Sequence, residues 1–223
     1  RMTNVLAQLS VTYLIAFLVM RKAVKWQLLV SFAMILLSYL LYQFWPVEGY
    51  NQPFVADHNF GTWFDVTLLG GMNSGHWVAF NAIPTTAHTI WGVIAGMILM
   101  NDWTPAKKVK TMLVAGIIGV AIGFALDPLV PIIKRICTPS FVIASGGFAM
   151  IGLAVSYWMI DMLKFRRGTK FFAIVGMNPL FIYLFAHIGG NELISKIYKP
   201  FVPLFLTWSG KLGIEIVVST LVW

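Results

Sequence analysis

Long apolar runs constrain the fold of this chain more than any other feature. Six runs, bounded by basic or by Pro- and Gly-rich segments, are each long enough for a helix, and a shorter seventh ends the sequence. Only helices or closed barrels cross a bilayer, and these continuous runs lack the alternating pattern of barrel strands. We therefore predict an all-α, polytopic transmembrane bundle with spans at residues 2–20, 26–44, 83–100, 111–126, 140–163 and 171–188, and a partial one at 211–223.

Composition excludes an ordinary soluble domain. Of the 223 residues, 59% are hydrophobic and 11% are charged, whereas soluble proteins have about 45–50% and 25%. The net charge of +8 is accounted for by basic loops at a membrane surface, so we expect a lipid bilayer and no nucleic acid as partner. The single cysteine excludes an intrachain disulfide and a cysteine-based metal site, and we expect no metal.

The two ends suggest a longer protein. The first residue is Arg, and the final apolar run has 13 residues, whereas a span needs about 20. We expect residues 1–223 to form a single transmembrane domain that is incomplete at both ends.

Basic residues predict the orientation of the bundle. Alternate loops carry 10 Lys and Arg residues on one side of the membrane, and 6, counting Arg1, on the other side. By the positive-inside rule the first set is cytoplasmic. The loop at residues 45–81, which has no Lys or Arg, is then external.

This external loop is rich in aromatic residues and contains His76, a candidate for substrate binding. A loop of this length is usually functional or disordered, and the aromatic content argues against disorder. Two interpretations stay open: an interfacial aromatic belt, or a rim on which flat aromatic faces stack against a sugar.

The third span begins with Asn81, a plausible helix cap and a candidate substrate ligand, and contains His88. His88 is either a packed histidine with one hydrogen bond or a catalytic group, and ionisable residues at membrane depth are functional candidates. Gly92 and Gly96 follow at four-residue spacing, which predicts a seam for another helix.

The sixth span is interrupted by Asn178 and Pro179. Because proline cannot donate a backbone hydrogen bond, the helix should kink there. Tyr183 and His187 share a face with Pro179, so the break either lines a cavity or is a plain kink. We take Asn178 and Tyr183 as candidate substrate ligands and His187 as a candidate catalytic residue.

Two further patterns concern packing. Asn4, Gln8 and Thr12 form a stripe on the first span that should face a neighbouring helix or a cavity. The Gly146-Gly147 pair of the fifth span is expected to be a close helix contact.

Several motifs together resemble the heparan-alpha-glucosaminide N-acetyltransferase-like family, which includes bacterial members of unassigned function. The start of the chain, Arg-Met-Thr-Asn-Val-Leu, is similar to that family's Arg-Ile-Pro-x-Val-Leu. Residues 138–147 are similar to its Thr/Ser-x-Ser-Tyr/Phe-Val…Gly-Gly segment, and Gly176-Met177-Asn178 with Tyr183 resembles its Gly-Met-Asn…Tyr signature. The family's proposed catalytic histidine precedes the first of these motifs.

The resemblance implies a multi-pass protein of the bacterial inner membrane that transfers an acetyl group from cytoplasmic acetyl-CoA to an external amino sugar or glycan. The external carboxylates favour a neutral or amino sugar over a polyanion. A sugar permease using the same cavity is the alternative, and a non-catalytic scaffold is a third hypothesis. A homodimer stays open.

Overall fold

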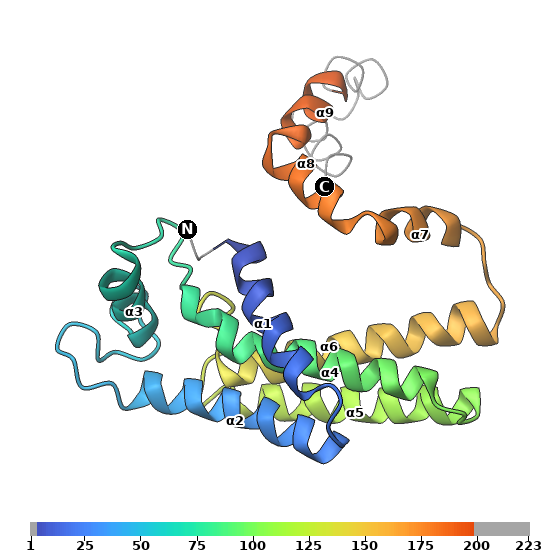
Figure 1. Cartoon of the computed structure of the whole chain (residues 1–223), viewed down its shortest axis with the longest axis horizontal. Helices are drawn as coiled ribbons and strands as arrows, with labels where there is room; N and C mark the ends of the chain where they lie inside the picture. The colour runs from blue at the N-terminus through green and yellow to red at the C-terminus, as the bar shows by residue number, and fades with distance from the viewer. Residues whose placement is uncertain (1–3, 199–223) are drawn as a thin grey trace. The chain divides into compact units, whose positions relative to one another are not determined.

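A computed structural model describes residues 4–198 of the chain, which contain helices and no strand (Figure 1). The chain divides into two compact units, Arg1–Lys164 and Phe165–Trp223. The predicted all-α class is confirmed for the described residues.

Four helices of the first unit are long and apolar enough to cross a membrane: α2 (Val24–Gln43), α4 (Ala82–Met100), α5 (Pro105–Leu126) and α6 (Pro139–Tyr157). The 3-10 turn η1 (Ala79–Asn81) precedes α4, and the π-helical turn η2 (Trp158–Met162) extends α6. At 1.5 Å per residue, a helix of 20 residues covers about 30 Å, the thickness of the hydrocarbon core. These helices correspond to the second to fifth predicted spans.

The other predicted spans are not confirmed as continuous membrane-spanning helices. Helix α1 (Val5–Val19) has 15 residues, about 22 Å at the helical rise. The sixth run is divided between α7 (Thr169–Met177) and α8 (Pro179–His187), and α9 (Gly190–Tyr198) follows. The predicted break at Pro179 is thereby confirmed. The seventh run, at residues 211–223, lies outside the described residues.

The helix ends of the first unit form two groups, which we define by their residues. The loop end comprises residues 44–81 and 127–138, and the basic end comprises residues 20–23, 101–104 and the end of η2. At the basic end the Lys108 ammonium donates to the Leu99 carbonyl at 2.7 Å, and the Gln27 amide of α2 lies 3.6 Å from Met97 Sδ of α4. Each long helix therefore runs between the loop end and the basic end.

Close packing of α5 on α6 depends on glycine. A Cβ on Gly147 would lie 2.6 Å from the Val120 nitrogen and 2.7 Å from the Gly116 oxygen. The predicted close contact at Gly146-Gly147 is confirmed. The predicted seam on α4 is wrong for the described residues, because a Cβ on Gly92 or Gly96 would have nothing within 4 Å.

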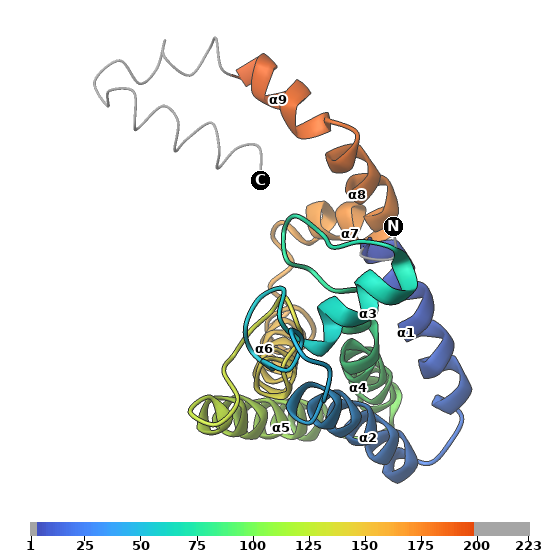
Figure 2. The same cartoon turned by 90° about the vertical axis from the view of Figure 1, so that its left-hand side faces the viewer.

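Helices α1 and α2 pack on other faces of α4 (Figure 2). Thr12 is fully buried in this arrangement, and the Gln8 amide donates to the Val78 carbonyl at 3.4 Å. Asn4 accepts a hydrogen bond from the Leu6 backbone and caps α1. The polar stripe of the first span therefore serves helix packing and capping.

The segment at residues 45–81 folds around an aromatic core. It contains α3 (Phe60–Leu69), whose Phe60 ring stands edge-on to Phe80 at a centroid distance of 4.8 Å. The ring centroids of Trp45 and Trp63 lie 4.5 Å apart. The core is completed by Tyr42, Phe64, Val78 and Ile136. Many aromatic side chains of this segment therefore pack against one another inside the fold. Neither the belt nor the rim interpretation includes this packing role.

Replacing Gly147 with alanine should destabilise the first unit by about 1–3 kcal/mol, because the new methyl group meets backbone atoms that cannot turn away. Gly152→Ala in the same helix is the matched control, since its Cβ meets nothing within 4 Å. We expect the control to be neutral or more stable, by up to about 1 kcal/mol. Thermal unfolding of the detergent-solubilised protein measures both. Equal melting temperatures for the two variants would contradict the close contact.

Candidate functional site

A row of three polar residues, Asn81, Thr85 and His88, runs from the end of η1 along α4. Their spacing of four and three residues places them in one row along the helix. Each contacts the segment at residues 135–145, which ends the α5–α6 connection and begins α6. We call these three residues and their partners the polar ladder. It joins the start of α4 to the α5–α6 connection and to the first turns of α6.

Asn81 forms the first step of the ladder. Its side-chain amide donates to the Arg135 carbonyl, whereas its buried Oδ1 has no partner among the described residues. The predicted capping role is wrong: Asn81 has helical dihedrals (φ −52°, ψ −25°) and makes no cap hydrogen bond. The reason is that η1 already starts the turn at Ala79, which frees the Asn81 amide to reach across to another segment.

Thr85 and Cys137 form the second step, with 3.1 Å between Oγ1 and Sγ. Burial raises the pKa of the Cys137 thiol, opposed by the Thr85 hydrogen bond and the charge of Lys134. Since only the thiolate is a good nucleophile, Cys137 is protonated and unreactive at neutral pH.

His88 forms the third step. Its Nε2 lies 2.9 Å from the Val142 carbonyl oxygen and 3.0 Å from Ser145 Oγ. A carbonyl can only accept, so Nε2 carries the proton of the neutral ring and Nδ1 keeps the lone pair. The Ser145 hydroxyl donates to the Phe141 carbonyl at 2.6 Å and thus accepts from His88. This excludes a serine nucleophile activated by His88 and assigns any basic role to Nδ1.

Tyr42 adds a second unpaired group at the loop end. Its hydroxyl is buried without a partner among the described residues and interacts electrostatically with Cys137 and Asp65. A buried polar group without a hydrogen bond costs about 1–3 kcal/mol. The Tyr42 hydroxyl and Asn81 Oδ1 thus keep hydrogen-bonding capacity that no described residue uses.

Asp65 connects α3 to the start of α4. Both carboxylate oxygens lie 3.1 Å from the Ala79 backbone nitrogen. Burial raises the pKa of the Asp65 carboxyl, partly offset by the hydrogen bond from Ala79. This buried acid fixes the aromatic core of the loop end against the ladder.

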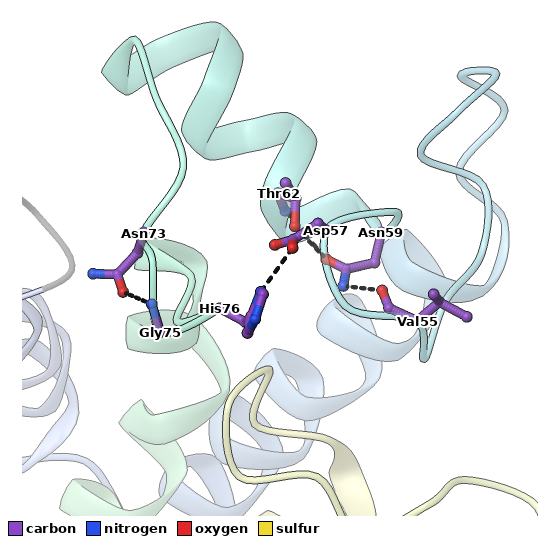
Figure 3. Close-up of polar contacts among 7 residues, drawn as sticks. All are labelled: Val55, Asp57, Asn59, Thr62, Asn73, Gly75 and His76. Atoms are coloured by element: carbon purple, nitrogen blue, oxygen red, sulfur yellow. Dashed lines mark hydrogen bonds and ion pairs between the residues drawn. The ribbon is translucent and has the colours of Figure 1, made fainter.

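His76 lies in the folded loop, where Figure 3 shows it facing Asp57. His76 Nδ1 is 2.7 Å from Asp57 Oδ2, and both residues have positive φ. Nearby, Asn59 caps α3 by accepting from the Thr62 nitrogen at 3.1 Å (Figure 3). Among the described residues His76 pairs with Asp57 and makes no hydrogen bond or ion pair with the ladder, so the structure does not bring this predicted substrate ligand together with His88 and Asn81.

Asn178, Tyr183 and His187 belong to the second unit. The Asn178 side chain precedes α8 and donates to the Ile174 carbonyl at 3.2 Å. Tyr183 is half-buried, and His187 is the last residue of α8, with its side chain outside the described set. Their meeting with the ladder residues stays a prediction.

Tyr42, Cys137 and Ser145 are the site residues that sequence reasoning missed. A signal existed for Tyr42, because Gln27, Ser31, Ser38 and Tyr42 recur along one face of α2 and are all buried. Cys137 and Ser145 are single small residues without a motif, so only the fold reveals them.

No family model, curated protein or solved structure matches this chain. Its function is therefore inferred from its own residues.

The raised pKa of Asp65 predicts a specific pH dependence of stability. The folded state retains the proton that the unfolded chain loses above about pH 4, so stability should fall as pH rises toward the folded pKa. Asp65→Asn keeps an acceptor for Ala79 and should flatten this part of the melting temperature profile. Asp102→Asn, at an exposed residue of the basic end, should leave the slope unchanged. An identical slope in Asp65→Asn would contradict the assignment.

Cys137 should resist alkylation. With the detergent-solubilised native protein at pH 7, a maleimide should label Cys137 at least about tenfold more slowly than after denaturation, since the thiol is buried and protonated. Mass spectrometry of the intact protein gives both rates. Thr85→Ala removes a hydrogen bond that lowers the pKa of the thiol, so we expect this variant to be labelled no faster than the wild type. Equal labelling of native and unfolded protein would show that the second step of the ladder is open.

Proposed function

We propose that the protein is a membrane-embedded acetyltransferase of the bacterial inner membrane, passing an acetyl group from cytoplasmic acetyl-CoA to an external amino sugar or glycan. The main observation in support is the fixed orientation of His88. Its Nε2 is committed to the Val142 carbonyl, which leaves Nδ1 as a base. The resemblance of three sequence motifs to glucosaminide acetyltransferases supports the same reaction.

In the proposed reaction the acceptor amine attacks the thioester carbonyl of acetyl-CoA. A C–N bond forms, the C–S bond breaks, and the amine proton passes through His88 Nδ1 to the departing CoA sulfur. General base catalysis of this kind contributes about 10²–10⁴-fold to a rate. The products are the N-acetyl sugar and free CoA.

Recognition of the acceptor is assigned to the loop end. Asn81 Oδ1 and the Tyr42 hydroxyl are buried hydrogen-bonding groups without partners among the described residues. An amide oxygen accepts from a sugar hydroxyl or amine, and the phenol can donate to a ring or hydroxyl oxygen. In this proposal Asn178 lies on the acetyl-CoA side, while His76, Tyr183 and His187 contribute to the acceptor side.

Acidic residues near this end favour a cationic or neutral acceptor. Residues 45–81 contain Glu48, Asp57 and Asp65 and no Lys or Arg, and residues 127–138 add Asp127, Lys134 and Arg135, so the loop end carries four carboxylates and two cations. The field of such a segment attracts an amino sugar and opposes a polyanionic chain.

Sugar transport is the second candidate, and the break between α7 and α8 favours it. Discontinuous helices with polar residues at the break are typical of substrate sites in secondary transporters. Here the Asn178 side chain is placed at the break, between Met177 and Pro179.

The test uses the full-length protein in proteoliposomes, with radiolabelled acetyl-CoA outside or inside and glucosamine on the opposite side. Free thiol release and acetyl incorporation are measured. His88→Gln retains a side-chain N–H for the Val142 carbonyl and removes the base, so we expect acetylation to fall about 10²-fold or more with little loss of stability.

Ser156→Ala in α6 is the control, because the Ser156 hydroxyl donates to the Gly152 carbonyl of its own helix, and its rate should remain within a few-fold of the wild type. A wild-type rate in His88→Gln would rule out the base. Uptake of labelled N-acetylglucosamine without any need for CoA would favour the transporter.

A further inference from the structure

An apolar groove of about 570 Å³ separates α2 from the loop end of α5 and α6. Its volume lies in the range of small-molecule sites, about 300–1,000 Å³. The only polar side-chain atom among its lining residues is the Tyr39 hydroxyl. The lining comprises Leu29, Phe32, Ala33, Ile35, Leu36 and Tyr39 of α2, and Leu126, Leu129, Val130 and Pro139 near the α5–α6 connection.

The shape of the groove suits one hydrocarbon chain. Its α2 wall is built from residues 29, 32, 33, 36 and 39, which follow a single helix face over about 15 Å. Phe32, Leu36 and Leu129 are 52%, 56% and 76% exposed. The groove also lies between helices long enough to cross a membrane, so its open side faces the hydrocarbon of the bilayer.

The groove borders the candidate site. Ile35 lines it and also packs in the buried cluster that contains Ala87 and Cys137. Pro139 lines it as well, two residues after Cys137. A chain in the groove is thus separated from the polar ladder by the Ile35 side chain, and its polar head would emerge at the loop end.

We propose that the acceptor is a lipid-linked amino sugar whose hydrocarbon chain binds in this groove while its sugar reaches the ladder. This inference rests on the proposed acetyl transfer for the identity of the head group. The transferred acetyl group and proton follow the reaction given above. A soluble sugar would leave the groove without a role in recognition. A lipid-linked sugar uses the groove and the polar ladder at once.

The probe is a glucosaminyl diacylglycerol with a photoreactive diazirine near the end of one acyl chain, incorporated in proteoliposomes with the full-length protein. After irradiation, peptide mass spectrometry should place the adducts on the groove residues of α2, such as Leu29 and Phe32. Ala33→Trp fills the groove and should reduce these adducts at least tenfold. Ala115→Trp, at an exposed position of α5 outside the groove, is the matched control and should leave them unchanged.

Kinetics separate this inference from the proposed function. Ala33→Trp should raise the KM for the lipid-linked acceptor at least tenfold and leave acetylation of free glucosamine unchanged. Ala33→Met offers a smaller obstruction if the Trp variant does not fold, with a smaller increase expected. Groove adducts without acetylation of either acceptor would uphold the chain site and refute the transferase.

Three outcomes would overturn the chain site. Adducts spread evenly over α5 and α2 would show bulk lipid contact only. A smaller oligomer for Ala33→Trp than for the wild type, measured by light scattering in detergent, would show that a second copy covers the groove. Equal losses for lipid-linked and free glucosamine in Ala33→Trp would show a general defect of the enzyme.

Discussion

The hydrogen bonds of a few polar side chains in an apolar interior govern this structure. Asn81, Thr85 and His88 project from a helix of mostly hydrocarbon side chains, and each has a partner in residues 135–145. These contacts fix α4 against the start of α6, and α6 in turn holds α5 through Gly147. Helices α1 and α2 then pack on the remaining faces of α4. The arrangement of the first unit therefore follows from one polar row and one small residue.

The orientation of the loop end depends on the same constraint. The Asp65 carboxylate accepts from the Ala79 backbone just before α4, and the aromatic core around Phe60 closes over that contact. A bilayer surface cannot hold such a loop in one place by itself. The buried acid does so from within the fold, and it thereby positions Asn81 at the head of the ladder.

Hydropathy predicts the helices well where a span is long and continuous, as in α2, α4, α5 and α6. It fails where local chemistry intervenes. Pro179 divides one apolar run into two helices, and this break is visible in the sequence. The folding of residues 45–81 around α3 is not visible there, because the aromatic pattern of these residues also fits an exposed belt. Gly92 and Gly96 have the spacing that predicts a close helix contact, yet the glycine that packs closely is Gly147, against α5. Spacing alone does not reveal which face of a helix meets a partner.

The site was predictable only in part. His88 and Asn81 could be named because polar residues in an apolar run are conspicuous. Their partners could not, since the Arg135 and Val142 acceptors are backbone carbonyls that no sequence pattern distinguishes. For the same reason the proton position on His88 emerges only from the fold.

The glycine contact between α5 and α6 has a consequence for motion within the first unit. A Cβ on Gly147 would meet backbone atoms of α5, so no side chain separates the two helices there, and closely packed interiors are hardly compressible. The two helices therefore move as one rigid pair. Any movement that admits a ligand to the polar ladder takes place between this pair and α4.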